Sequence, residues 1–402
     1  MAFGNEYTRA LQQAKEHQRL WRQKIQRLRE ILAGVPRGQQ LSLSVEETQT
    51  NYALLNVTLK AFALTRNIRG TRVIFHNAPR EIEYWFNDDV KGVAVQDFQD
   101  MLKDRFGCGM GVLGIGSDGG SFIQYIDPLD VWWDPDFGYR SPSWVIRRIR
   151  RARRVVYEYW DTNTHAFFNE SEGVLHEEEN PLRIIPIRFL ENIYSVPGID
   201  FPRSDTEQVI APQNLISEAL RSLIDQARRG VGFFEYQISA VDPLEIEKLK
   251  EPGEQFVGTE TGNAITPKIT PPPSPEWLNI ITIAKNDIDA LSGVSEYLRG
   301  AMPVANNLKF ATQVLAVIGS QNMRIDADWV PVKELLEWAA YVWLSVAHVN
   351  RERHRVNDIV IDASTIDISQ VSVKCEEDEN AFSVSSVGIT PDDIASTFAG
   401  GS

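Results

Sequence analysis

The stretch Trp277-Leu-Asn-Ile-Ile-Thr-Ile-Ala-Lys-Asn-Asp-Ile-Asp-Ala-Leu291 does most to decide the fold. Its apolar residues recur at spacings of four, three, four and three, which places them along one narrow face of a helix. These seam residues are Trp277, Ile281, Ala284, Ile288 and Leu291. A proline-rich run ends at Pro275, and Gly293 stops the pattern. The sequence therefore predicts a helix over about 275–292.

A second helix of the same kind comes earlier in the chain, over residues 213–229. One apolar stripe follows its length: Leu215, Ile216, Ala219, Leu220, Leu223, Ile224 and Ala227. The intervening residues 230–275 are rich in glycine and read as short strands and turns. The pattern therefore predicts two helices that are connected by a compact segment of short strands and turns.

The N-terminal residues 5–33 also read as one long amphipathic helix, which Gly34 and Pro36 end. Its apolar stripe is Tyr7, Leu11, Ala14, Trp21, Ile25, Leu28 and Leu32, and arginines and lysines occupy the other faces. The helix either docks on its own domain or serves as a basic arm that touches a partner or DNA.

The rest of the chain alternates between helical and β-type patterns. Helices are expected over 45–68, 79–105 and Phe310–Asn350, the last with a kink near Pro331, and a short strand over Arg72–His76. Strands dominate 108–190, beginning at Gly111 and turning at Asp118-Gly119. The tail 356–402 alternates in β style. The fold class expected is α+β, mainly α-helical.

The composition favours a folded protein of two or three domains, or a strongly elongated one, because 402 residues exceed one ordinary core. The net charge of -14 does not suit a standard nucleic-acid grip, so any contact with DNA should slide rather than hold. The densest basic cluster, from Arg147 to Arg154, needs acidic partners, which are either protein carboxylates, including those of a neighbouring subunit, or a phosphate backbone.

Several classes of protein are disfavoured. Cys108 and Cys375 form neither a zinc motif nor a disulfide framework, the N-terminus lacks the apolar core of a signal peptide, and no apolar run is long enough to cross a membrane. A cytosolic origin is expected.

The sequence also lacks the familiar catalytic motifs, so no catalytic residue, cofactor or metal is predicted. The glycines of 111–120 are followed by β-type sequence rather than the helix that a phosphate loop requires. Asp127, Asp130, Asp134 and Asp136 suit a turn-rich strand better than a cation site, and His176 lies in a solvated run of glutamates.

Three phrases resemble the portal proteins of tailed bacteriophages. Ile126-Asp-Pro-Leu-Asp-Val-Trp-Trp-Asp-Pro135, followed by Trp144-Val-Ile-Arg, is similar to their wing segment. Ile288-Asp-Ala-Leu-Ser-Gly-Val-Ser-Glu-Tyr-Leu-Arg-Gly300 is similar to the end of their stem helix. Ala311-Thr312-Gln313 stands where many portals have Ala-Thr-Glu. The order of helix, excursion, helix, loop and long helix over about 45–350 agrees.

The resemblance implies an elongated portal-type subunit with wing, stem, clip and C-terminal (crown-side) regions. Carried onto this chain, its divisions are a wing over 1–212, stem helices over 213–229 and 275–293, a clip over 230–274, a tunnel loop over 294–310, a long kinked wing helix over 311–350 and a C-terminal wing or crown segment over 351–402. The chain is short for the family, so a long crown is not expected.

The resemblance also implies roles for particular residues. Those of the tunnel loop that would touch DNA are Arg299, Asn306, Asn307 and Lys309. Those of the clip that would contact terminase and adaptor are Phe233, Phe234, Tyr236 and Phe256. Those that would pack the stem are Leu220, Leu223, Ile281 and Ile288. Since two amphipathic helices do not bury their own seams, we expect the seams to be covered between neighbouring copies in a ring.

The implied function is a ring of twelve copies at one capsid vertex, made in the host cytoplasm, through which double-stranded DNA is packaged and ejected. The implied partners are other copies of the chain, the large terminase, head-completion, adaptor and tail proteins, and the major capsid and scaffolding proteins, with no membrane. Two alternatives stay open: another viral capsid or baseplate assembly protein, and a metal- or nucleotide-dependent DNA enzyme built on 111–136.

Overall fold

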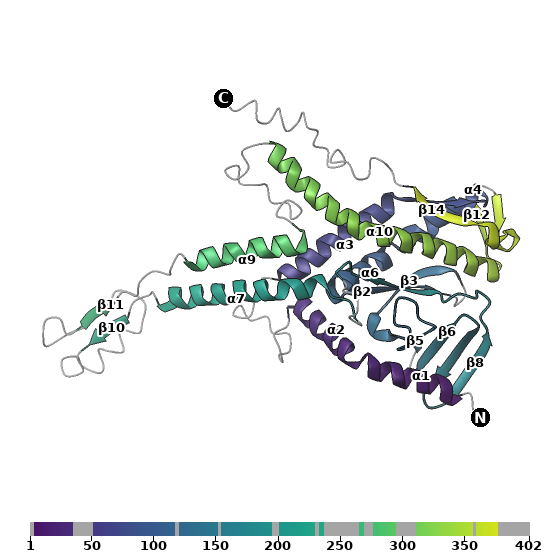
Figure 1. The fold of residues 1–402 in the computed structure, drawn as a ribbon, viewed down its shortest axis with the longest axis horizontal. Coiled ribbons are helices and arrows are strands. Elements are labelled where there is room, and N and C mark those ends of the chain that lie inside the picture. Colours follow the sequence, from purple (N-terminus) through teal and green to yellow (C-terminus); the bar gives the residue numbers. More distant parts are fainter. Residues whose placement is uncertain are drawn as a thin grey trace. The chain divides into compact units, whose positions relative to one another are not determined.

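The computed structural model describes residues 4–34, 51–116, 120–151, 154–194, 201–229, 233–236, 265–268, 276–294, 311–356 and 359–376. Two compact units make up the chain. The larger unit holds Met1–Ile210 and Asp289–Ser402, and the smaller unit holds Ala211–Ile288. The fold is α+β with helices predominating, as the sequence predicts (Figure 1).

The helical core of the larger unit lies among three long helices. These are α3 (Tyr52–Gly70), α6 (Val95–Cys108) and α10 (Ala311–Val349). Leu64, Phe98 and Trp343 are buried together in this core. Short helical pieces lead into α6: α4 (Arg80–Tyr84), the π-helical η2 (Trp85–Val90) and α5 (Lys91–Val93). The single helix predicted over 79–105 is therefore three α-helical segments and one π-helical segment, and α10 continues as a helix through Pro331.

Antiparallel sheets form the rest of the larger unit. A five-stranded sheet has the order β4-β5-β6-β7-β8, a three-stranded sheet the order β3-β2-β9, and β1 pairs with β14 and β12 with β13. The strands are β1 (Arg72–His76), β2 (Met110–Gly116), β3 (Phe122–Ile126), β4 (Val131–Trp133), β5 (Trp144–Arg151), β6 (Arg154–Asp161), β7 (Thr164–Asn169), β8 (Gly173–Glu179), β9 (Ile187–Glu191), β12 (Arg353–Val356), β13 (Ile359–Asp362) and β14 (Ser372–Glu376).

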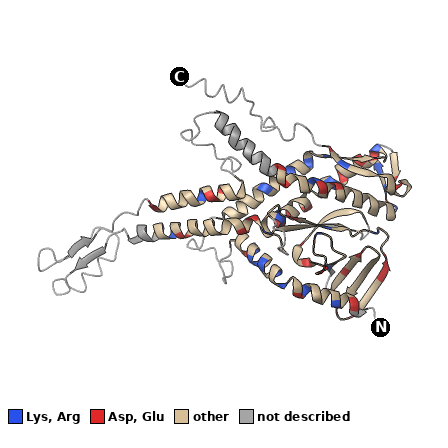
Figure 2. Cartoon of the chain, in the orientation of Figure 1, with Lys and Arg blue, Asp and Glu red and all other residues tan. Residues whose placement is uncertain are grey.

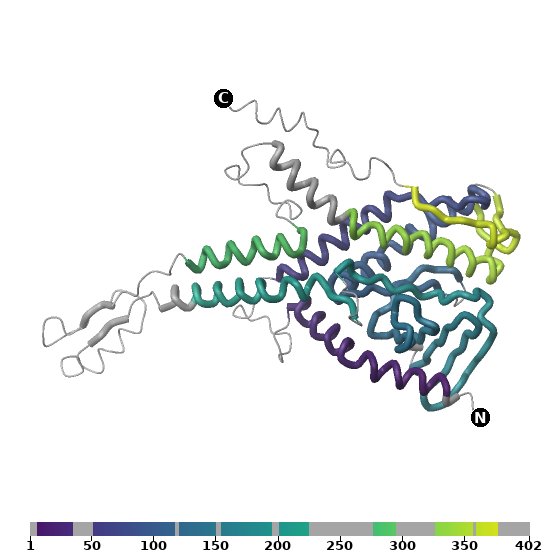
Figure 3. Tube along the Cα trace, viewed as in Figure 1, coloured from purple at the N-terminus to yellow at the C-terminus, as the bar shows by residue number. Residues whose placement is uncertain are grey.

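The predicted N-terminal helix is present as α1 (Gly4–His17) and α2 (Arg19–Leu32), which are separated by a turn at Gln18. Its apolar stripe is buried. Leu11 and Ala14 pack against the five-stranded sheet, and Trp21 and Ile25 pack against Met110 and Trp133. Figure 3 shows both helices running along this part of the unit. The helix is therefore docked on its own domain by its apolar face.

A side chain bonds to one residue on each outer edge of the two-stranded β1–β14 sheet. Asn87, from the π-helical segment, accepts from Val73 N at 3.0 Å and donates to Val73 O at 2.8 Å. On the other edge, Cys375 N donates to Glu337 Oε1 at 2.9 Å. Val73 and Cys375 face each other in the register, so both outward-pointing main-chain sites at this level have partners.

The glycines near 111 serve packing. Gly109 ends α6 with a φ of 97°, a left-handed conformation that favours glycine. A Cβ on Gly111 would collide with the main-chain oxygen and side chain of Met101, so glycine is needed for β2 to lie against α6. Strand β3 follows this segment rather than a helix, which excludes the geometry of a phosphate-binding loop here.

The smaller unit contains most of α7 (Asp205–Arg229) and α9 (Glu276–Ser292), which run alongside each other in Figure 1. Between them, β10 (Phe233–Tyr236) pairs antiparallel with β11 (Ile265–Lys268). Helix α7 begins eight residues before the predicted start at 213. A capping box causes this: Ser204 Oγ accepts from Glu207 N at 3.1 Å, and Glu207 Oε2 accepts from Ser204 N at 2.8 Å.

Candidate assembly interface

The apolar seams of α7 and α9 are buried in part within one copy of the chain. Ile281, Ala284 and Ile288 are buried on α9, and Ile216 and Ala219 on α7. Apolar side chains at helical spacing reach this degree of burial only when a neighbouring element covers them. The expectation that the seams are covered only between neighbouring copies is therefore wrong for these five residues, which are buried in a single copy.

Other apolar residues on the same two helices are exposed, and three of them belong to the α7 stripe. Leu278 and Ile283 on α9 are 60% and 59% exposed, and Leu215, Leu220 and Ile224 on α7 are also exposed. Ile283 follows the seam residue Ile281 by two positions, which turns it by about 200° around the helix. We call Leu215, Leu220, Ile224, Leu278 and Ile283 the outer apolar set.

The outer apolar set is large enough to drive association. Burying one Leu or Ile side chain contributes roughly 1.5–3 kcal/mol, so five such residues offer several kcal/mol before the entropy of association is subtracted. Charged neighbours on the exposed faces, Glu218 and Arg221 on α7 and Lys285 and Asp287 on α9, would give a polar rim.

The first turn of α7, which belongs to the larger unit, is held by a buried network of charges. Lys60 Nζ lies 2.6 Å from Asp205 Oδ2 and 3.7 Å from Asp328 Oδ2. Asn192 Nδ2 donates to Asp205 Oδ1 at 2.6 Å. The network joins α3, the segment after β9, α10 and the start of α7.

Arg105 completes the network and is wholly buried. Its Nη1 donates to Asp328 O and its Nε to Glu191 O, both at 3.0 Å, and Nη2 lies 3.3 Å from Asp328 Oδ1. Burial lowers the pKa of Lys60, but the charges of Asp205 and Asp328 outweigh it, so that this pKa is raised. Two cations and two carboxylates thus compensate each other away from water.

The predicted stem-packing residues separate into two groups. Ile281 and Ile288 lie in the buried seam, whereas Leu220 is exposed and Leu223 is half-buried. Phe233, Phe234 and Tyr236 lie on β10, where Phe233 pairs with Lys268 and Tyr236 with Ile265. Phe256, Arg299, Asn306, Asn307 and Lys309 lie outside the described residues.

Three arginines of the predicted basic cluster have acidic partners within their own chain. Arg147 pairs with Glu158, Arg148 with Asp130, and Arg154 Nη1 lies 3.7 Å from Glu172 Oε1. The possible cation site at Asp127–Asp136 is divided in the same way, since Asp127 is held by Arg29 at 2.9 Å. In the part of the chain that the structure describes, no three acidic, cysteine or histidine side chains come together as a metal site would require.

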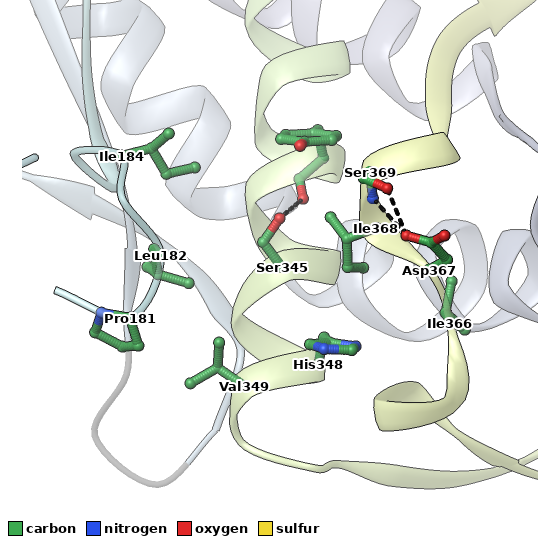
Figure 4. A pocket seen from close by; sticks show the side chains of 11 residues that line it. Pro181, Leu182, Ile184, Ser345, His348, Val349, Ile366, Asp367, Ile368 and Ser369 are labelled. Carbon is green, nitrogen blue, oxygen red and sulfur yellow. Dashed lines mark hydrogen bonds between the residues drawn. The ribbon is translucent and has the colours of Figure 1, made fainter.

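A pocket of about 310 Å³ lies between the end of α10 and the loops at 181–184 and 366–369 (Figure 4). Its walls are mainly apolar, with Leu182, Val349 and Ile368 among them. The polar groups at its rim bond to nearby groups: Ser345 Oγ donates to Tyr341 O at 2.9 Å, and Ser369 Oγ to Asp367 Oδ1 at 2.6 Å. These hydrogen bonds hold the residues of the pocket wall in place, and neither of them joins a nucleophile to a base.

Comparison with known proteins gives matches among solved structures alone. No family model and no curated protein matches the sequence. A chain of the neck of the native gene transfer agent (GTA) particle, computed with C12 symmetry, aligns with a TM-score of 0.47 and 13% identity over 87% of this chain and 89% of that one. A chain of the neck of the empty GTA particle gives 0.47 and 14% over 90% and 92%. A chain of the native GTA virion gives 0.46 and 12% over 93% and 95%.

The similar structures are thus components of a virion, and two of them belong to its neck. Among the described residues, no helix combines the length and apolar character needed to cross a membrane.

Proposed function

We propose that this chain is a structural subunit that assembles into a ring at one capsid vertex, in the manner of a phage portal. The observation that carries the proposal is the outer apolar set on α7 and α9. A helical pair with a covered seam and a second exposed apolar set suits contact with neighbouring copies. If the same two patches meet in every pair and the rotation closes, the product is a ring.

In this proposal each copy contributes one helical pair to the wall of a conduit for double-stranded DNA. The family resemblance gives twelve copies. The excess of carboxylates in the chain, 55 acidic against 41 basic residues, would keep a passing duplex from adhering. Arg299, Asn306, Asn307 and Lys309 would then contact DNA transiently from the tunnel loop at 294–310.

The partners follow from the same resemblance. The segment 230–274, with β10 and β11, would receive the large terminase during packaging and the head-completion adaptor and tail proteins afterwards. The larger unit would meet the major capsid and scaffolding proteins. The motor would hydrolyse ATP, so this chain would need no catalytic residue.

Negative-stain images of the purified full-length protein test the proposal. Rings with a central hole are expected. A compact monomer at every protein concentration would contradict it, and an open sheet or filament would favour another capsid or baseplate component. Turnover of DNA or ATP by the purified protein with magnesium would favour an enzyme instead.

A further inference from the structure

A groove in the larger unit gathers four basic side chains around one tryptophan, and the carboxylates of Asp127 and Asp130 also line it. Three basic side chains line it from α1 and α2, and Arg148 from β5 and Trp132 from β4 face them. The α1–α2 residues are Lys15, Arg19 and Arg22. The groove has a volume of about 520 Å³, and Figure 2 shows the basic residues spaced along α2.

The positive groups converge on the indole ring. The guanidinium carbon of Arg22 lies 4.3 Å from the centroid of Trp132, Lys15 Nζ lies 5.8 Å from it, and the guanidinium carbon of Arg148 lies 6.0 Å from it. Burial, and then the charge of Arg148, lower the pKa of Arg22 to about 10. Positive charge is therefore crowded in this groove.

The carboxylates of the chain neutralise this charge in part. Lys15 pairs with Glu170 at 2.6 Å, and Arg148 pairs with Asp130. Arg22 instead donates to the main-chain oxygens of Leu129 and Val131. Arg19 is exposed and makes no ion pair with any side chain that the structure describes. Two guanidinium groups are left without a carboxylate partner within the described residues, in a protein whose net charge is -14.

The basic residues of α1 and α2 lie in a row that suits the successive phosphate groups of one nucleic-acid strand. Guanidinium groups bind phosphate through paired N–H donors. Those of the exposed Arg19 have no partner among the described residues, whereas Arg22 already donates to Leu129 O, Val131 O and Gln18 Oε1. Lys15, Arg19 and Arg22 follow one another at spacings of four and three, so they span about 10 Å along the helices. Phosphates along one DNA strand advance by about 3.4 Å each, so the row covers about three of them.

We propose that this groove binds the phosphate backbone of double-stranded DNA. The groove shares no residue with the outer apolar set or with the tunnel loop at 294–310, so variants in it test DNA binding apart from ring formation. Since the rest of the chain is acidic, the contact is confined to this groove and depends strongly on salt.

The test measures binding of a short fluorescein-labelled duplex to the full-length protein by anisotropy at increasing NaCl concentration. Arg19→Gln should weaken binding several-fold at low salt and reduce the slope of log affinity against log salt by about 1. Arg27→Gln is the matched control. It removes the same charge from the same helix, but Arg27 pairs with Glu30 at 2.7 Å and does not line the groove. Melting curves of both variants should match the unmutated protein.

Competitors identify the ligand. Unlabelled duplex should displace the probe, whereas inorganic phosphate and polyglutamate at matched charge should not. Displacement by inorganic phosphate alone would mean a site for single phosphate groups and would overturn the proposal, as would efficient displacement by polyglutamate, which would mean an acidic protein segment. Equal losses in Arg19→Gln and Arg27→Gln, or no binding at low salt, would also overturn it.

Discussion

Lys60 and Asp205 form a buried ion pair, with Nζ 2.6 Å from Oδ2 and side chains 7% and 3% exposed. They are 145 residues apart in the chain. Because the carboxylate stands in the first turn of α7, the pair fixes where that helix begins within the larger unit.

Replacing Lys60 by Met should destabilise the protein strongly, because it leaves the buried carboxylate of Asp205 without its ion-pair partner, while Arg105 still pairs with Asp328. Breaking such a pair from one side costs about 3–5 kcal/mol. Urea unfolding followed by circular dichroism measures the loss. Lys103→Met is the control, since Lys103 forms an exposed pair with Asp100 and should lose about 0–1 kcal/mol. Equal midpoints for the two variants would show that the network carries no stability.

Charge placed on the outer apolar set should separate assembly from folding. Ile283→Asp should keep the helical content and melting temperature of the unmutated protein and sediment as single copies, because Ile283 is exposed in one copy and covered in the proposed ring. Ile281→Asp puts a carboxylate in the buried seam and should melt the helical pair itself. Sedimentation velocity and circular dichroism on both variants distinguish these effects. Intact rings of Ile283→Asp would remove that face from the interface.

Stability should fall as pH rises through the pKa of His165. Burial lowers this pKa, but hydrogen bonds to Glu158 and Glu178, at 3.1 and 2.8 Å, outweigh it, and the pKa is raised. A raised pKa in the folded state means that the imidazolium contributes fully below about 6.5, its ordinary value, and that the contribution is lost above the folded value.

The measurement is the free energy of unfolding against pH for the unmutated protein and His165→Gln. The difference between the two curves should narrow toward alkaline pH. His176→Gln, at an exposed position on β8, serves as the control and should follow the unmutated protein. If the difference in unfolding free energy between the two proteins stayed constant across the whole pH range, a charged His165 would be contradicted.

Cys108 should be protected from alkylation in the folded protein. Burial, followed by the nearby carboxylate of Asp104, raises the pKa of its thiol, so little thiolate is present near neutral pH. Iodoacetamide followed by peptide mass mapping should find Cys108 unmodified in buffer and modified in urea. Rapid labelling in buffer would show that the contact between α6 and α2 opens readily.

Local periodicity accounts for the elements that the sequence predicts well. The alternation of Arg72–His76 is enough to place β1, which has those bounds. The apolar stripe from Leu11 to Leu28 identifies the buried face of α1 and α2, because every residue of this stripe is buried in the structure. The turn at Gln18 interrupts that helix without changing which face is buried.

A readable signal was missed at the start of α7. Ser204 and Glu207 form the Ser-x-x-Glu pattern that opens a helix, whereas the apolar stripe alone places the start of the helix at 213. The helix that starts at this pattern continues past Pro212, which lies inside it.

Long-range pairing lay beyond the sequence. Nothing near Arg105 indicates that its partner is Asp328, 223 residues away, and a lone Arg or Lys on a helix is normally read as exposed. Likewise, the apolar stripe of α9 looks the same whether a second copy or α7 covers it. The distinction between the seam and the outer apolar set therefore required three-dimensional structure.

Asn87 and Glu337 each occupy main-chain groups on one outer edge of the β1–β14 ribbon, at Val73 and at Cys375. An open ribbon edge is a template on which a strand from another molecule can add, and a chain made in many copies at high local concentration is especially exposed to that hazard. Loss of either side chain should free these main-chain groups to pair with a strand of another molecule. At high protein concentration the resulting aggregation would compete with assembly of the proposed ring.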